Sequence, residues 1–134
     1  MSNSATINPL WKIVRRIQNQ LHPAVSIATG NTTVTADSAQ NGGAVVSNLG
    51  ATGTVTVALP AAKVGMKVTA LVQSAQALRL DPNGTETIAL PTGVQQAAGK
   101  YITNSTIGST IQLIVVKQGQ WDVAASNGTF TAEA

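Results

Sequence analysis

Side chains that could carry out acid–base or metal chemistry are few in this chain, and they are scattered along it. The single histidine, His22, stands directly before Pro23 at the end of a predicted helix, where a capping or solvent-facing role is typical. A serine or threonine nucleophile needs such a base beside it, and one histidine makes no metal cluster. The absence of cysteine excludes a disulfide framework and a thiolate metal site. We therefore expect no enzyme activity, no catalytic residues, no cofactor and no metal site.

Asp81 and Glu86 are the two acidic residues that lie closest together in the sequence. They flank a turn, so their carboxylates could lie side by side and serve acid–base chemistry or calcium binding. The run Asp81-Pro82-Asn83-Gly84 is also explained by turn formation alone, because proline presets φ and glycine accepts a positive φ. We favour the turn over a functional carboxylate pair.

The strongest candidate for a binding element is an amphipathic helix, predicted over residues 9–21. Asn8 is a favoured N-cap, Pro9 suits the first helical position, and the residue before Pro23 is pushed out of the helical region. One face of this helix carries an apolar stripe, and the rest is polar and basic. The residues expected to bind a partner are Leu10, Trp11, Ile13, Val14, Ile17 and Leu21 on or beside the stripe, with Lys12, Arg15 and Arg16 around it.

Three kinds of partner suit such a helix. Its basic residues could contact the phosphates of a nucleic acid, or the helix could lie on a membrane surface. Three basic side chains on one short helix are a weak signal for nucleic acid, and no known DNA-binding motif frames them. We favour docking on protein: on another protein, on copies of the same chain, or on the chain's own β-domain.

Charge is scarce and unevenly placed. Only 10% of the residues are charged and 3% are aromatic, both low for an ordinary soluble domain. Three of the eight basic residues and none of the five acidic ones precede residue 23, so the rest of the chain carries five charges of each sign. A surface this poor in charge suits a chain that buries much of it against copies of itself or a large assembly.

The sequence contains no apolar run near the roughly 18–20 residues that a membrane-spanning helix needs. The N-terminal apolar positions are interrupted by basic residues, unlike those of a signal peptide. We therefore expect the protein to fold in the cytoplasm of the cell that makes it.

A β-domain is predicted over residues 43–134, joined to the N-terminal segment 1–22 by a polar connector, residues 23–42. Apolar and hydroxyl residues alternate in short runs, and turn residues recur every 8–12 positions. This pattern favours a small β-sandwich or barrel-like domain of short antiparallel strands, preceded by one helix. The expected strands cover residues 44–48, 54–57, 67–72, 78–80, 85–88, 100–103, 110–117, 120–124 and 129–131, with weaker patterns at 26–29 and 32–36.

Local motifs predict several contacts within this domain. Gln118-Gly119 predicts a hairpin between two long strands, and the turn at residues 81–84 predicts a hairpin or a tight corner. Trp121 suits a core or subunit-interface anchor. The run Gly53-Thr-Val-Thr-Val-Ala-Leu-Pro60 recurs as Gly84-Thr-Glu-Thr-Ile-Ala-Leu-Pro91, either by chance or as two equivalent strand–turn–strand units, since two copies are too few for a solenoid.

Several of these motifs, taken together, resemble a known group of proteins. The relevant stretches are Leu59-Pro60-Ala61-Ala62 with Gly65, residues 78–84, Thr87-Ile88, Gly119-Gln-Trp-Asp-Val123 and Asn127-Gly128-Thr129. They resemble the capsid decoration (cement) proteins of tailed bacteriophages and related fibre-type, β-rich virion proteins. The resemblance lies within residues 53–131 and does not include the predicted N-terminal helix. It implies a non-enzymatic virion structural protein on the capsid surface, commonly a homotrimer that binds the major capsid protein or another virion protein.

Two other functions stay open at this point. A tail-fibre or baseplate component would share the composition and the strand pattern. A carbohydrate-binding β-module would also lack catalytic residues, although lectins usually show several exposed aromatic side chains and this chain has four aromatic residues in all.

Overall fold

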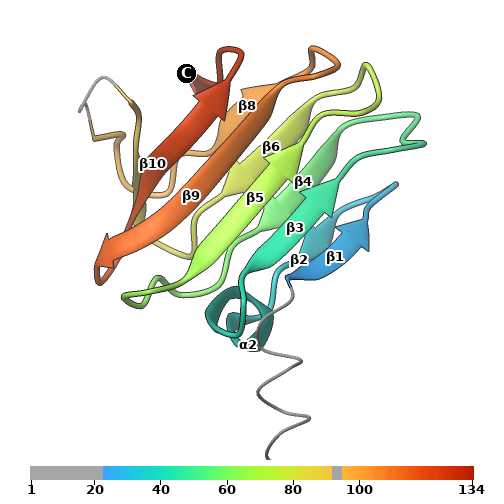
Figure 1. The fold of residues 1–134 in the computed structure, drawn as a ribbon. Coiled ribbons are helices and arrows are strands. Elements are labelled where there is room, and N and C mark those ends of the chain that lie inside the picture. The colour runs from blue at the N-terminus through green and yellow to red at the C-terminus, as the bar shows by residue number, and fades with distance from the viewer. Residues whose placement is uncertain (1–22, 92–94) are drawn as a thin grey trace, which may run out of the picture.

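The computed structural model of the chain describes residues 23–91 and 95–134, and these residues form two mixed β-sheets around one core. Figure 1 shows sheet A in front, with strand order β1-β3-β5-β9-β10-β7, and sheet B behind it, with strand order β11-β8-β6-β4-β2. The strands are β1 (Ala24–Ile27), β2 (Thr32–Thr33), β3 (Ala44–Ser47), β4 (Val55–Ala58), β5 (Lys67–Leu71), β6 (Leu78–Asp81), β7 (Thr87–Ala89), β8 (Ile102–Asn104), β9 (Thr110–Lys117), β10 (Gln120–Asn127) and β11 (Thr131–Ala132).

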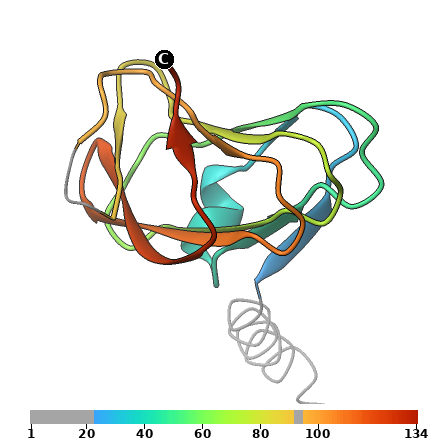
Figure 2. The same cartoon turned by 90° about the horizontal axis from the view of Figure 1, so that it is seen from above.

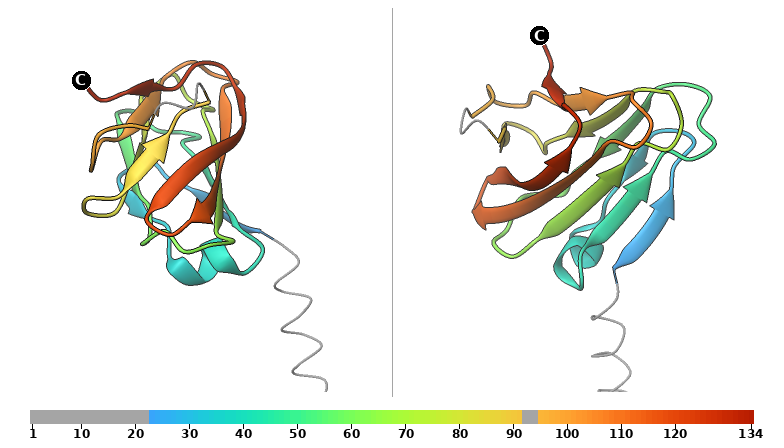
Figure 3. Two further views of the ribbon diagram at one scale, coloured as in Figure 1. Left: turned by 90° about the vertical axis from the view of Figure 1, so that its left-hand side faces the viewer. Right: turned by 45° about the horizontal axis from the view of Figure 1, so that its top comes forward.

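The first six strands form three stacked coils. The chain passes from sheet A to sheet B and back, so that β1, β3 and β5 lie side by side in sheet A and β2, β4 and β6 in sheet B. Every neighbouring pair within these two sets is parallel, as in a short solenoid. The view from above in Figure 2 and the turned views in Figure 3 show the two layers that result.

The remaining strands complete the two sheets with mostly antiparallel pairs. β9 pairs antiparallel with both β5 and β10, and β8 pairs antiparallel with both β6 and β11. The predicted hairpin at Gln118-Gly119 is confirmed, since Gln120 pairs with Lys117 across it. The β7 strand runs parallel to β10.

The expectation of a mainly β fold is confirmed, whereas the expectation of antiparallel strands is wrong for five of the nine strand pairs, which are parallel. Residues 81–84 form a corner and not a hairpin, because β6 belongs to sheet B and β7 to sheet A. The echo between residues 53–60 and 84–91 does not mark equivalent units either. The first copy forms β4 in sheet B and the second forms β7 in sheet A. The strands that pair with β4 are β2 and β6.

The predicted connector, residues 23–42, contains elements of the β-domain. Its strands β1 and β2 are the outermost members of the two sheets, and it also holds a short helix, α2 (Ala36–Gln40). The Thr35 side chain caps this helix by accepting a hydrogen bond from the Ser38 N–H at 3.2 Å. Ala39 is buried in the core, so α2 covers the end of the sandwich at which β3 begins (Figure 1).

Alternation along the strands builds the core. In β4, in β6 and in β9 as far as Val115, every second side chain is buried and the others are partly exposed. Trp121 from β10 is fully buried among them, which agrees with its expected role as an anchor. The largest fully buried side chains are Trp121, Met66, Leu78, Leu80, Ile88, Ile102, Ile111 and Leu113.

Asn48 fixes the corner at which the chain leaves β3. Its side chain is fully buried, and its Oδ1 accepts hydrogen bonds from the N–H groups of Gln73 (2.7 Å) and Ser74 (3.0 Å). Its Nδ2 donates to the carbonyl oxygens of Ser74 (3.2 Å) and Gln76 (3.1 Å). These four bonds join the corner after β3 to the corner after β5, so successive coils turn at the same height.

Replacing Asn48 with alanine should strongly destabilise the fold, since four backbone groups would lose their partner. We expect the free energy of unfolding to fall by at least about 3 kcal/mol, because each buried polar group left unpaired costs roughly 1–3 kcal/mol. The matched control is Asn41→Ala, which removes an exposed bond to Asp37 and should cost less than about 1 kcal/mol. Urea denaturation of both variants measures the difference, and equal losses would contradict this role of Asn48.

Candidate interaction surface

The outer face of sheet A is a broad surface whose side chains share one chemical character. In β5, Val68 and Ala70 point into the core, so Thr69 and Leu71 point outward, and the registers of the neighbouring strands continue this division. One row runs Val25–Val45–Thr69–Gln112–Ala125, and the next runs Ile27–Ser47–Leu71–Thr110–Asn127. We call the following residues the sheet A face: Val25, Ile27, Val45, Thr69, Leu71, Thr110, Gln112, Ile114, Val116, Ala125 and Asn127.

This face is apolar and hydroxyl- or amide-bearing, with little charge. The six strands of sheet A contain three charged residues, Lys67, Lys117 and Asp122. Lys67 and Asp122 flank Ile114 in one row, and the Asp122 carboxylate accepts a hydrogen bond from the Gln120 side chain at 2.9 Å. Removing such a surface from water costs little, because few ions must lose their hydration.

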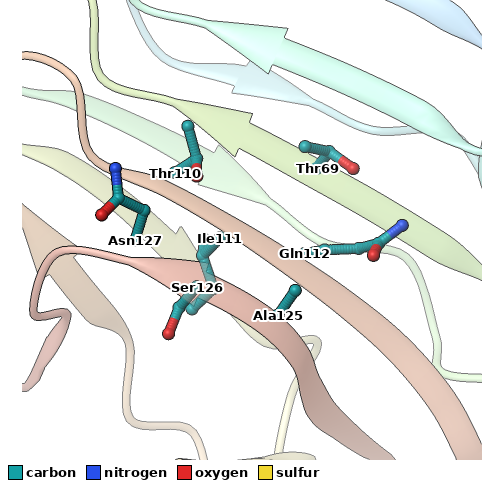
Figure 4. A pocket seen from close by; sticks show the side chains of 7 residues that line it. All are labelled: Thr69, Thr110, Ile111, Gln112, Ala125, Ser126 and Asn127. Carbon is teal, nitrogen blue, oxygen red and sulfur yellow. The ribbon is translucent and has the colours of Figure 1, made fainter.

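Two shallow depressions mark the middle of the sheet A face. The first, of about 340 Å³, lies where β10 bulges against β9, and Figure 4 shows its lining. The second, of about 210 Å³, extends toward Pro23, Gly43 and Lys67. Thr69 and Gln112 line both depressions, so the two are adjacent. Their hydroxyl and amide groups can donate and accept hydrogen bonds, which suits a protein surface better than an ionic ligand.

The outer face of sheet B has a different character. Thr56, Arg79, Thr103 and Thr131 form a row across it. The Arg79 guanidinium carbon lies 4.6 Å from the centre of the Tyr101 ring, a cation–π arrangement.

Charged groups gather at one margin of sheet B. Lys100 Nζ lies 3.2 Å from Glu133 Oε2, and both side chains are about one-third exposed. Burial raises the pKa of the Asp81 carboxyl above its ordinary value of 3.8, and the nearby Glu133 carboxylate raises it further. The Glu133 carboxylate therefore attracts the Lys100 ammonium group and repels the ionised form of Asp81.

The structure separates Asp81 from Glu86, which were the one candidate carboxylate pair. Asp81 lies near Glu133, whereas both oxygens of Glu86 accept from the Ala62 N–H, at 2.9 and 3.2 Å. Glu86 therefore fixes the loop between β4 and β5. Within residues 23–91 and 95–134, no three His, Asp or Glu side chains gather as a metal site would require.

The predicted partner-binding helix and His22 lie outside the described residues, so Leu10, Trp11, Lys12, Ile13, Val14, Arg15, Arg16, Ile17 and Leu21 stay a prediction. In the part of the chain that the structure describes, no helix is long and apolar enough to cross a membrane. The sheet A face was missed by sequence reasoning. Alternation in residues 110–117 shows that every second side chain points one way, but the partner strands decide which way is outward.

Asp81→Asn should stabilise the protein at neutral pH. The raised pKa means that the folded protein holds the Asp81 proton more tightly than the unfolded chain does. Protonation of Asp81 therefore stabilises the fold below pH 3.8, and this stabilisation is lost as the pH rises through the raised pKa. The melting temperature of Asp81→Asn should therefore exceed that of the unaltered protein at pH 7, and the two should converge below about pH 4. Thermal melts across this range test it, with Asp37→Asn as the control, and a lower melting temperature of Asp81→Asn at pH 7 would contradict it.

No protein-family model and no curated protein matches the chain. Its function is therefore inferred from the geometry and chemistry of its own residues.

Proposed function

We propose that this protein is a non-enzymatic structural component of a tailed-bacteriophage particle, a decoration protein that binds the capsid surface. The observation that carries the proposal is the sheet A face, which is broad, shallow and nearly free of charge. An enzyme site is typically a concave pocket with converging polar groups, whereas a docking site on a large particle is flatter. The resemblance of residues 53–131 to decoration and fibre-type virion proteins supports the same class.

The size of the sheet A face suits attachment of modest strength. Five neighbouring strands from β1 to β10 span about 19 Å at roughly 4.8 Å per strand. Val25 and Ile27 are 69% and 63% exposed, and Val116 is 67% exposed, so apolar area is available for burial. At about 25 cal/mol per Å² of apolar area, a few such side chains contribute several kcal/mol before the costs of association.

The predicted helix over residues 9–21 supplies a second contact in this proposal. Its apolar stripe would bury against the capsid or a neighbouring subunit, while Lys12, Arg15 and Arg16 meet acidic groups at the rim. The chain reaches the sheet A face at Pro23, which lines one of the depressions.

Self-association as a homotrimer is part of the proposal, and its support is the resemblance together with the low charge of the chain. Light scattering at micromolar concentration tests it, and a monomer would count against it. In this proposal the protein is made in the bacterial cytoplasm and resides on the capsid.

A carbohydrate-binding module is the second candidate, and the Arg79–Tyr101 pair on sheet B is the observation that favours it. Aromatic rings beside charged side chains are common in sugar sites, but here the guanidinium already covers one face of the ring. Reproducible binding on a glycan array, lost in Tyr101→Ala, would favour this candidate over the structural one.

Thr69→Glu should weaken binding to the capsid, because it places a carboxylate in the centre of the docking face. We expect at least about a tenfold loss of affinity for tail-less heads from the phage that carries the protein, as an unpaired charge at an interface costs more than 1.4 kcal/mol. The matched control is Thr56→Glu, which adds the same charge to the outer face of sheet B. Sedimentation of heads with each variant measures the loss.

Equal binding by the two glutamate variants would remove the sheet A face from the proposal. If the unaltered protein does not bind tail-less heads but is present in purified tails, the tail-fibre or baseplate alternative holds instead.

Deletion of residues 1–22 should separate anchoring from folding. If the helix is an anchor, the truncated protein should keep its melting temperature and its oligomeric state while losing binding to heads. A much lower melting temperature, or aggregation, would show that the helix packs on its own β-domain. Normal decoration by a stable truncated protein would contradict the anchoring role.

A further inference from the structure

The β1 strand is an exposed edge of sheet A. It lies at the end of the strand order, and among the described residues only β3 pairs with it. All four of its residues are exposed, including the inward-pointing positions, because the first coil has no further coil stacked on it. Figure 1 shows β1 and β2 together at this open end of the two sheets.

The backbone of β1 presents hydrogen-bonding groups on its open side. The N–H groups of Ala24 and Ala28 donate to β3-side carbonyl oxygens, at 3.0 and 2.8 Å. In a parallel pair the residues between such donors direct their N–H and C=O groups the other way. Val25 and Ile27 therefore present two donors and two acceptors to the open edge.

Within the described residues, this edge lacks the features that usually prevent pairing. Natural edge strands carry charged side chains, bulges or a covering segment, whereas no charged residue occurs between Pro23 and Ala36. The opposite edge of sheet A is different. There, Gln95 forms an isolated bridge with Ala89, and the Gln96 N–H donates to the Ile88 carbonyl oxygen at 3.0 Å.

We propose that β1 pairs antiparallel with β1 of a second copy of the chain, about a two-fold axis at Ser26. In this register Val25 lies opposite Ile27 of the partner subunit, and Ile27 opposite Val25 of the partner subunit. Both are hydrogen-bonded pairs, so all four open-edge groups of each strand are satisfied. The Val25 and Ile27 side chains of the two copies meet on the outer face, where such apolar cross-strand pairs stabilise a sheet.

A second copy fits this edge better than the predicted helix over residues 9–21. A helix uses its backbone groups internally, so it cannot satisfy Val25 and Ile27. The short run Val-Ser-Ile is self-complementary, with its two edge-facing residues placed symmetrically about Ser26. A two-fold contact of this kind involves two copies only, so it joins two chains into a dimer. If the chain is a trimer, the same contact joins two trimers. The pairing does not depend on a role in a virion.

A single cysteine at the axis tests the proposal in the full chain, which has no cysteine of its own. Two Ser26 residues would face each other as a non-hydrogen-bonded pair, with Cα atoms about 4.5 Å apart, within the range for a disulfide. Ser26→Cys should form disulfide-linked dimers at least about tenfold faster than Ser105→Cys, a control at another exposed serine. Equal rates of cross-linking for the two variants would overturn the proposal. A monomer in which the β1 edge is covered by residues 1–22 would give this result.

A second variant removes the pairing and leaves the fold. Val25→Pro, made in the Ser26→Cys protein, deletes an edge-facing N–H but none of the bonds to β3, and proline is tolerated at such positions. Cross-linking should fall to the Ser105→Cys rate while the melting temperature stays within a few degrees. Undiminished cross-linking in a folded Val25→Pro protein would overturn the register proposed here.

Discussion

The four hydrogen bonds of the Asn48 side chain are the constraint on which the coiled part of the fold depends. A chain that passes repeatedly between two sheets must turn at the same place in each coil, or the parallel strands lose register. Asn48 meets this need because its amide satisfies two donors and two acceptors in the corner of the next coil. A buried amide without those partners would be costly, so the corner and the residue stabilise each other.

Other asparagines make similar links between distant parts of the chain. Asn31 Oδ1 accepts from the Thr56 N–H at 3.0 Å, which joins the first coil to the second. Asn104 donates to the Thr129 carbonyl oxygen at 2.7 Å and holds the last strands against sheet B. Gly128 belongs to the same corner. It has a φ of 87°, and a Cβ atom there would overlap the Ser109 side chain. With 10% charged residues, the protein relies on neutral amides for contacts that ion pairs often make elsewhere.

The stacking of coils also gives the molecule two unlike faces and two unlike ends. Sheet A presents aliphatic, hydroxyl and amide groups outward, whereas sheet B carries the Arg79–Tyr101 pair and the Lys100–Glu133 ion pair. At one end, β1 pairs with β3 alone among the described residues, and at the other Gln95 and Gln96 contact β7. In the function proposed above, this face with little charge and the β1 edge beside it would provide the contacts to a particle and to a second copy.

Local pattern was sufficient for the strands and for one hairpin. Alternation in residues 110–117 and the turn at Gln118-Gly119 predicted β9, β10 and their antiparallel pairing, since a two-residue loop joins adjacent antiparallel strands. The low charge of the chain also favoured a surface that associates, and that stays a prediction. In contrast, the short helix α2 was missed, because Thr35 and Ser38 form its cap within a run of small polar residues that equally suits a loop.

Only the tertiary structure decided which strands pair, and therefore which side chains form the candidate surface. β4 and β7 have similar sequences but lie in different sheets, because pairing across a coil depends on where the corners fall and not on the strand itself. The residues of the sheet A face come from five strands, each with an ordinary alternation. The sequence determined that each strand has one apolar side and one mixed side. The positions of its neighbours determined which of those mixed sides join into one face.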